Sequence, residues 1–132
     1  LYSPALPRDI VIVNINPMMR DALPKSPAAI QDRVNEISFN ASLLAELRAI
    51  NFVTKLIEGG FTDGGRLKPM LIHTIDAEEE VCSLGVSSKL NAQWDFLSSL
   101  YEMGREKASH FLDTHFDDIG KRSSTNIEEK FL

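Results

Sequence analysis

Ile10-Val11-Ile12-Val13-Asn14-Ile15 is the stretch that decides the fold, because it is a β-branched run without polar alternation. Such a run is typical of a strand that is buried on both faces, as in a parallel sheet covered by helices. Asn16-Pro17 ends the run, and two prolines within residues 1–9 predict an extended linker before it. We therefore expect an α/β fold whose first strand spans residues 10–15.

A long helix is predicted to follow this strand. Ser26 is a favourable N-cap, and Pro27 suits the first helical position, where its missing N–H costs nothing. Gly59-Gly60 ends the helix. Phe39 and Phe52 widen its apolar face, as do Leu43 and Leu56, so we expect more than one side to be covered. The face itself repeats at three- and four-residue spacing: Ile30, Val34, Ile37, Ala41, Leu44, Leu47, Ile50, Val53 and Ile57.

Residues 70–75 predict a second strand, so that strand, helix and strand form a βαβ unit. Residues 76–80 are acidic and suit a short helical start. A second long helix follows Ser87-Ser88 and ends at Gly120, and Thr125-Asn126-Ile127-Glu128 has the capping-box pattern of a final short turn. The apolar face of the second long helix is predicted at Leu90, Trp94, Leu97, Tyr101, Gly104, Ala108, Phe111, Leu112, Phe116 and Ile119.

Length and composition exclude several classes of protein. The chain has 132 residues, which suits one domain, and its net charge of −5 argues against nucleic acid as the main partner. Residues 1–60 carry 6 basic and 6 acidic groups and residues 61–132 carry 8 and 13, so the whole excess lies past residue 60, where we expect a solvated helix face. A single cysteine excludes an internal disulfide and a thiolate-only zinc site. No apolar run approaches the roughly 20 residues of a membrane span.

Two segments of the chain partly match the motifs of nucleophilic catalysis. Gly85-Val86-Ser87-Ser88-Lys89 is the nearest approach to a Gly-x-Ser-x-Gly nucleophile elbow, but it ends in Lys and follows no strand. Ser87 and Ser88 are better explained as helix caps. Asp63-Gly64-Gly65 could hold a catalytic carboxylate on a tight backbone, but it is also a common turn between a helix and a strand.

No metal or cofactor is expected. Several potential ligands are close in sequence, namely His73, Asp76, Glu78, Glu79 and Glu80. Residues 73 and 76 point to opposite faces of a strand, and His110 and His115 are five apart and do not share a helix face. Cys82 has no local basic partner and is expected to be a buried small hydrophobe.

One position is suggestive because of the expected topology. Asn14 and Asn16 lie at the carboxyl end of the first strand, and ligands of open α/β sheets bind at that edge. The alternative is that Asn-x-Asn-Pro simply ends the strand. From the residues alone, the chain is therefore a helix-rich α/β piece without a self-contained active site.

An ordered set of segments resembles the C-terminal third of bacterial patatin-like phospholipases, and it covers residues 10–132. No single segment is diagnostic. The segments are Val11-Ile12-Val13-Asn14-Ile15-Asn16-Pro17, Asn35-Glu36-Ile37-Ser38-Phe39-Asn40 with Leu43-Leu44, Glu46-Leu47-Arg48-Ala49-Ile50, Leu71-Ile72-His73-Thr74-Ile75, Ser87-Ser88-Lys89-Leu90-Asn91, Trp94-Asp95-Phe96-Leu97, Gly104-Arg105 and His115-Phe116-Asp117.

The resemblance implies a lipid acyl hydrolase with a three-layer α/β/α fold. It implies a Ser–Asp dyad, with Ser on a Gly-x-Ser-x-Gly elbow, and a glycine-rich oxyanion loop. All of these would precede Leu1, so residues 1–132 would be a single C-terminal fragment that holds no catalytic, cofactor or metal residue. Asp63 follows the long helix, whereas the family's Asp precedes the strand that resembles residues 10–15, so no catalytic role is carried to it. A start without Met, and only two strands, are consistent with a fragment.

The resemblance further implies that the parent enzyme acts on a lipid or fatty acyl ester. It also implies that this enzyme works in the cytoplasm or at the membrane periphery. If the two apolar helices complete a larger core, the chain alone should expose hydrophobic surface and form homo-oligomers. Three classes of function stay open: an enzyme fragment that is inactive alone, a complete small enzyme that uses Asp63 with Ser87 or Ser88, and an interaction module without catalysis.

Overall fold

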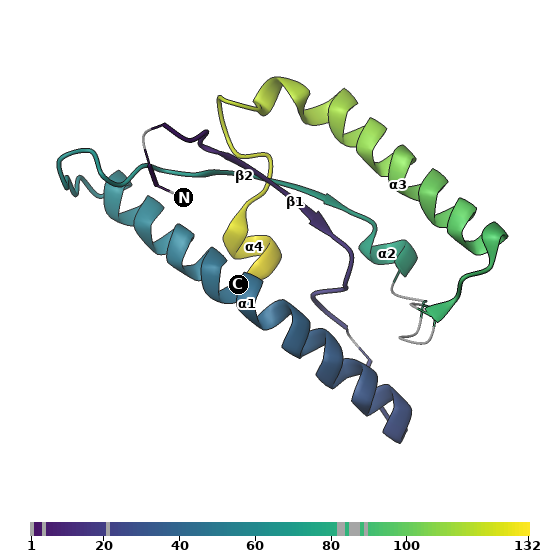
Figure 1. Ribbon diagram of the computed structural model, residues 1–132. Helices are drawn as coiled ribbons and strands as arrows, with labels where there is room; N and C mark the ends of the chain where they lie inside the picture. The colour runs from purple at the N-terminus through teal and green to yellow at the C-terminus, as the bar shows by residue number, and fades with distance from the viewer. Residues whose placement is uncertain (1, 4, 21, 82–83, 85–87, 89) are drawn as a thin grey trace. The chain divides into compact units, whose positions relative to one another are not determined.

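The computed structural model describes residues 2–3, 5–20, 22–81, 84, 88 and 90–132. Its elements are strand β1 (Asp9–Asn14), helix α1 (Pro27–Glu58), strand β2 (Leu71–Asp76), helix α2 (Glu78–Val81), helix α3 (Trp94–His115), the 3₁₀ turn η2 (Phe116–Asp118) and helix α4 (Ile127–Phe131). The strands pair in parallel and α1 connects them, which confirms a mixed α/β chain with a βαβ-like arrangement (Figure 1). Among the described residues, no helix combines the length and hydropathy needed to cross a membrane.

The chain divides into two compact units, each assembled from separate segments. Unit 1 contains Leu1–Ile12, Ser42–Thr74 and His115–Leu132, and unit 2 contains Val13–Ala41 and Ile75–Thr114. Helix α1 therefore contributes its first part to unit 2 and its second part to unit 1. The two units are described separately below.

The ends of α1 follow the predicted local signals. The Ser26 hydroxyl accepts a hydrogen bond from the Ala29 N–H at 3.2 Å, which satisfies one donor of the first turn. At the other end, the Gly60 backbone has φ +90°, a left-handed conformation that a side chain disfavours, and the Phe61 N–H donates to the Leu56 carbonyl at 3.0 Å. The start and the stop of this helix are confirmed.

Unit 1 has an apolar core between α1, β2 and α4. Its buried side chains include Leu47 and Ile50 of α1, Ile72 of β2, and Phe131 of α4. Glu128 of α4 also accepts a hydrogen bond from Asn51 at 3.1 Å and pairs with Lys55, so polar contacts hold α4 against the same helix. Asn126, rather than Thr125 of the predicted capping box, caps α4: its side chain accepts from the Glu128 N–H at 3.0 Å.

A segment after η2 satisfies the backbone of β2. The Ile72 N–H donates to the Ser123 hydroxyl at 3.0 Å, and the Ile72 carbonyl accepts from the N–H groups of Ser124 and Thr125, both at 3.1 Å. Residues 123–125 thus take the hydrogen-bonding positions that a third strand would occupy at Ile72, although the segment itself is not a strand.

The predicted apolar face of α1 is only half right. Its second part is confirmed, because Leu47 and Ile50 are buried. In the first part, Ile30, Val34 and Ile37 are exposed, and Phe39 and Phe52 are exposed as well, so the expectation of cover on more than one side is wrong for this chain. The two buried positions of the first part are instead polar: Glu36 and Asn40.

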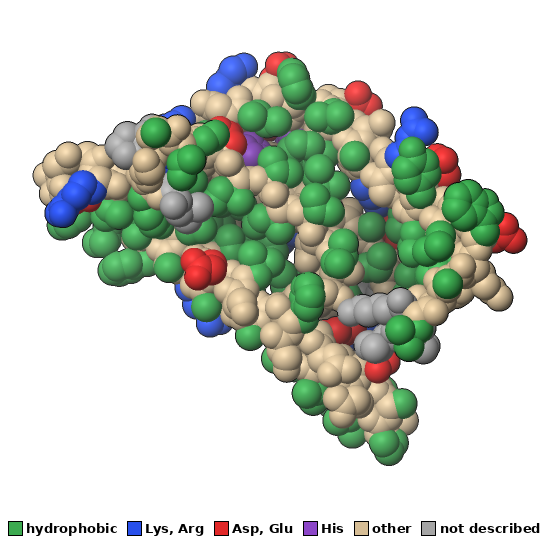
Figure 2. Space-filling model, in the orientation of Figure 1, with side chains coloured by type: hydrophobic (Ala, Val, Ile, Leu, Met, Phe, Trp, Pro, Cys, Tyr) green, Lys and Arg blue, Asp and Glu red, His purple; other side chains and the backbone are tan. Residues whose placement is uncertain are grey.

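The expected buried face of α3 is also wrong in most of its length. The helix begins at Trp94 rather than near Leu90, and Trp94, Leu97 and Tyr101 are exposed, with Trp94 at 78%. The side that lines the interior of unit 2 carries Phe96, Leu100, Met103 and Lys107. Of the predicted face, Phe111 is buried and Gly104 lines the same interior, so the prediction is confirmed at these two positions. Both sides of α3 therefore carry apolar residues, and hydrophobic side chains are visible over α3 and the first part of α1 (Figure 2).

Strand β1 is not buried on both faces as its composition predicts. Val11, Val13 and Ile15 alternate along one face and are exposed, with Val13 at 66%. Successive side chains of a strand point to opposite faces, so Val11 and Val13 share one apolar side of β1, and Ile15 follows directly after the strand. Val13 and Ile15 also line a cavity that α3 borders, which is described below.

Candidate functional site

A cavity of about 560 Å³ lies within unit 2, at the carboxyl ends of both strands. This volume lies in the range of small-molecule pockets, which are mostly apolar with a few placed polar groups. The apolar lining comprises Val13, Ile15, Pro17, Phe39, Ile75, Ala77, Val81, Leu84, Phe96, Leu100, Met103 and Gly104. The polar lining comprises Asn14, Asn16, Glu36, Asp76, Ser88 and Lys107. We call this cavity the unit 2 pocket.

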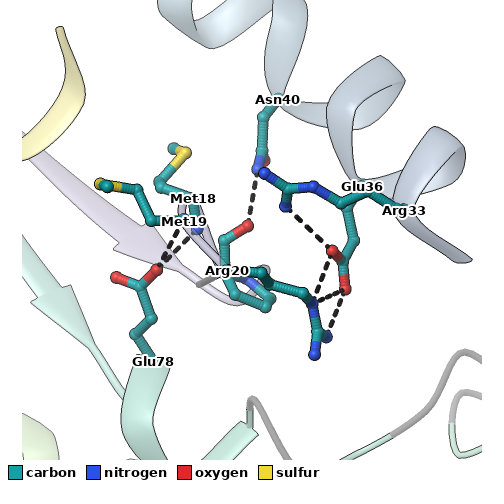
Figure 3. Close-up of polar contacts among 8 residues, drawn as sticks. Met18, Met19, Arg20, Arg33, Glu36, Asn40 and Glu78 are labelled. Carbon is teal, nitrogen blue, oxygen red and sulfur yellow. Dashed lines mark hydrogen bonds and ion pairs between the residues drawn. The ribbon is translucent and has the colours of Figure 1, made fainter. Parts of the chain in front are cut away.

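Two elements hold the loop that leaves β1 and borders the pocket. Glu78 Oε1 of α2 accepts hydrogen bonds from the N–H groups of Met18 at 2.7 Å and Met19 at 3.2 Å. From α1, the Asn40 amide donates to the Pro17 carbonyl at 3.1 Å (Figure 3). The backbone that carries the wall of the pocket is therefore fixed by side chains from two helices.

A carboxylate on α1 holds the end of the same loop. The Arg20 Nε atom lies 2.9 Å from Glu36 Oε2, and Arg33 Nη1 lies 3.2 Å from the same oxygen (Figure 3). The hydrogen bonds from Arg20 are the main reason that the pKa of Glu36 is lowered, and Arg33 adds to the effect. Glu36 is almost fully buried, so these pairings are what make an ionised carboxylate acceptable at this position.

Asn14 and Asn16, for which the sequence left both a ligand position and a simple strand end open, line the pocket at the carboxyl end of β1. Both side chains are buried. Among the described residues, Asn14 Nδ2 has no hydrogen-bond acceptor. Because an unsatisfied buried amide donor costs about 1–3 kcal/mol, its presence in a cavity marks a position where a ligand acceptor would be stabilised.

Lys107 is the one basic side chain among the described residues that line the pocket. Its ammonium lies 2.5 Å from Glu80 Oε1, and this interaction is the main cause of the lowered pKa of Glu80. With Glu36 also paired to arginines, Glu36, Glu80 and Lys107 are all engaged in ion pairs. Besides these groups, the pocket presents apolar surface, the amides of Asn14 and Asn16, the Ser88 hydroxyl and the Asp76 carboxylate.

Asp63 forms a turn. Its Oδ1 accepts hydrogen bonds from the N–H groups of Gly65 and Arg66, each at 3.1 Å, in the Asx-type geometry that Asp commonly adopts. Gly64 and Gly65 both have positive φ, at +77° and +82°. The turn interpretation of this motif is therefore what the geometry supports.

The other candidate ligands and nucleophiles do not assemble into one site. Glu78 and Glu80 of α2 hold the loop after β1 and Lys107, respectively, and His115 bonds Asp118 at 2.9 Å. Within the described part of the chain, no group of three or more potential ligands could hold a metal ion. Ser88 lines the pocket, whereas Ser87 and Cys82 lie outside the described residues.

A Ser–His–Asp set that the sequence analysis missed lies in unit 1. His73 Nδ1 is 3.0 Å from Ser124 Oγ, and His73 Nε2 is 3.0 Å from Asp9 Oδ1. The residue types match a hydrolytic triad, but His73 has 0% exposed surface, and a base needs access to the substrate proton. We therefore assign a structural role, not a catalytic one, to the three residues of this set. Since 64 and 51 residues separate its members from His73, no local motif signals it.

Glu36 and Asn40 are site residues that the sequence analysis quoted only as part of a resemblance. Their spacing in the sequence is a signal, because two polar residues at positions i and i+4 share one face of a helix. Apolar neighbours at Ile37 and Ala41 concealed that signal, because they defined a competing stripe. Comparisons with protein-family models, with curated proteins and with solved structures found no match to this chain.

Proposed function

We propose that this chain is the C-terminal part of a patatin-like serine acyl hydrolase, an enzyme that cleaves lipid esters with a Ser–Asp dyad. In this proposal the dyad belongs to a part of the enzyme outside residues 1–132. The chain completes the core of a three-layer α/β/α fold and shapes the acyl groove. The parent enzyme works in the cytoplasm or peripherally on a membrane, and the chain alone does not catalyse.

The observation that carries the proposal is the convergence of separate segments on one pocket. The residues that resemble patatin-like phospholipases lie far apart in the chain, yet segments 11–17, 35–40 and 94–97 all contribute to the lining of the unit 2 pocket. Ile75, Ser88 and Gly104 from three further segments line it too. A mostly apolar pocket of this size suits a fatty acyl chain.

The uncovered apolar surfaces fit the same proposal. Strand β1 and one side of α3 expose residues that a larger core would bury, such as Val11 and Trp94. A soluble monomer rarely exposes large apolar patches, so these surfaces favour cover by another polypeptide. They equally support a second candidate function, in which the chain is a self-associating interaction module without catalysis.

Ester hydrolysis by the purified chain separates these candidates. We expect no turnover of a short-chain p-nitrophenyl ester. Turnover that Asp63→Ala abolishes would overturn the proposal and make the chain a complete small enzyme. Asp63→Asn is the matched control, because its amide oxygen retains the acceptor that the turn uses.

The coding sequence upstream of Leu1 gives a second test. A Gly-x-Ser-x-Gly motif there, followed by an Asp-Gly-Gly or Asp-Gly-Ala motif, is the expected result. An initiator Met directly before Leu1 would contradict the enzyme fragment and favour the interaction module.

A further inference from the structure

The unit 2 pocket contains a hydrogen-bond donor that its own walls do not satisfy. Asn14 is 8% exposed, lines the cavity, and has no acceptor for its Nδ2 atom among the described residues. Asn14 is the last residue of β1, and the paired loop that follows it holds the backbone in place. A fixed amide donor inside a mostly apolar cavity suits a ligand that carries an oxygen acceptor.

The charges around the pocket decide what kind of acceptor fits. Glu36 and Asp76 line the cavity, and the only lining cation in the described part of the chain, Lys107, is paired with Glu80. The charge of Glu36 is balanced by Arg20 and Arg33. A ligand carboxylate would lose its hydration, approach the Asp76 carboxylate, and meet a cation that Glu80 already pairs with. A neutral carbonyl oxygen faces none of these costs and still accepts from Asn14.

We propose that the unit 2 pocket binds neutral acyl ligands, esters or amides, through a hydrogen bond from Asn14 Nδ2 to the acyl carbonyl oxygen. The hydrocarbon chain packs against Phe39, Leu100 and Met103. The pocket discriminates against the free carboxylate of the same chain length, so Asn14 is a specificity-determining residue. The acyl class of the ligand rests on the proposed function, whereas the preference for a neutral acceptor rests on the charges described above.

The experiment compares two probes on the purified chain: a pyrene-labelled fatty acid and its methyl ester, each titrated by fluorescence below its critical micelle concentration at pH 7.5. We expect the ester to bind at least about tenfold more tightly than the acid, because burying a carboxylate in this pocket, near Asp76 and without an unpaired lining cation among the described residues, costs more than one hydrogen bond returns. This comparison needs no variant and so does not depend on a substitution that unfolds the protein.

Three variants test the role of Asn14. Asn14→Leu removes the donor at similar volume and should weaken ester binding roughly three- to tenfold, the effect of one neutral hydrogen bond. Asn14→Asp removes the donor with little change of shape and should weaken it at least as much. Asn35→Asp makes the same chemical change at an exposed position of α1 outside the pocket lining and should leave the affinity unchanged. Circular dichroism checks that each variant is folded.

The outcomes distinguish this inference from the proposed function. Equal binding of ester and acid, or unchanged ester binding in folded Asn14→Leu and Asn14→Asp, would overturn the specificity and leave an acyl pocket in place. Binding of neither probe to the folded chain would overturn both the specificity and the proposed acyl groove.

Discussion

His73 Nε2 lies 3.0 Å from Asp9 Oδ1, and this contact joins the interior of β2 to the first residue of β1. The same carboxylate oxygen accepts from the Gly120 N–H at 2.7 Å, and this backbone hydrogen bond is the main cause of the lowered pKa of Asp9. Three distant parts of the chain therefore meet at the Asp9 carboxylate, which bonds a buried imidazole.

Replacing this imidazole should destabilise the protein. We expect His73→Ala to lower the free energy of unfolding by about 2–4 kcal/mol, because it removes two hydrogen bonds and leaves a cavity at a site without exposed surface. Urea denaturation followed by circular dichroism measures the change. His110→Ala on the exposed side of α3 is the control and should stay within about 0.5 kcal/mol of wild type. A similar loss in both variants would contradict the assignment.

Ser124 should be structural rather than nucleophilic. Ser124→Ala is expected to lower the free energy of unfolding by about 0.5–1.5 kcal/mol, the value of one hydrogen bond, with no effect on reactivity. A fluorophosphonate probe, which labels activated serines, should leave the purified chain unlabelled. Labelling that disappears in Ser124→Ala but persists in Ser109→Ala would show that the Asp9–His73–Ser124 set is catalytic.

Glu36 should make stability depend on pH in acid. Its pKa is lowered in the folded protein from an ordinary value of 4.5, so its contribution is complete above that pH and is lost as the pH falls through the folded pKa. We expect Glu36→Gln to lower the free energy of unfolding by roughly 1.5–3 kcal/mol at pH 7. The difference from wild type should shrink below about pH 4.5 in denaturation series from pH 7 to pH 3.

Glu102→Gln supplies the matched control for this series, because Glu102 is exposed on α3 and its loss should change stability by no more than about 0.5 kcal/mol. A wild-type difference from Glu36→Gln that stays constant down to pH 3 would refute the role of the charged pair.

The exposed side of α3 should drive self-association. We expect sedimentation equilibrium to show mass that rises with concentration, because Trp94, Leu97 and Tyr101 expose a contiguous apolar stripe. Leu97→Lys should shift the equilibrium toward monomer by tenfold or more, roughly 1.4 kcal/mol of association energy. Ser109→Lys adds the same charge to an exposed polar position and should leave the equilibrium unchanged. A monomer across a wide concentration range would contradict the prediction.

Local signals predicted the parts of the fold that depend on neighbouring residues. Ser26 and Gly60 set the ends of α1 through hydrogen bonds and backbone conformation within a few residues, so the sequence was sufficient for both. Periodicity failed for α3 because Trp94 and Phe96 belong to two different apolar sides of one helix. Only tertiary contacts decide which side is buried, and a single sequence does not report them.

The candidate site divides in the same way. A ligand site at Asn14 and Asn16 was one of the two interpretations that the sequence offered, because ligands bind at the carboxyl ends of parallel strands. The roles of Glu36 and Asn40 did not follow, because their partners lie in a loop 16 and 23 residues away, and that pairing exists only after the chain has folded.

The hydrogen bonds of Ser123, Ser124 and Thr125 to Ile72 have a consequence for aggregation. An unpaired strand side is a template onto which another chain can add, and such additions seed polymers. Residues 123–125 occupy the N–H and the carbonyl of Ile72, so an incoming strand would have to displace three hydrogen bonds there. Addition of a strand along this side of β2 is therefore opposed at Ile72, which lowers the tendency of this edge to seed polymers.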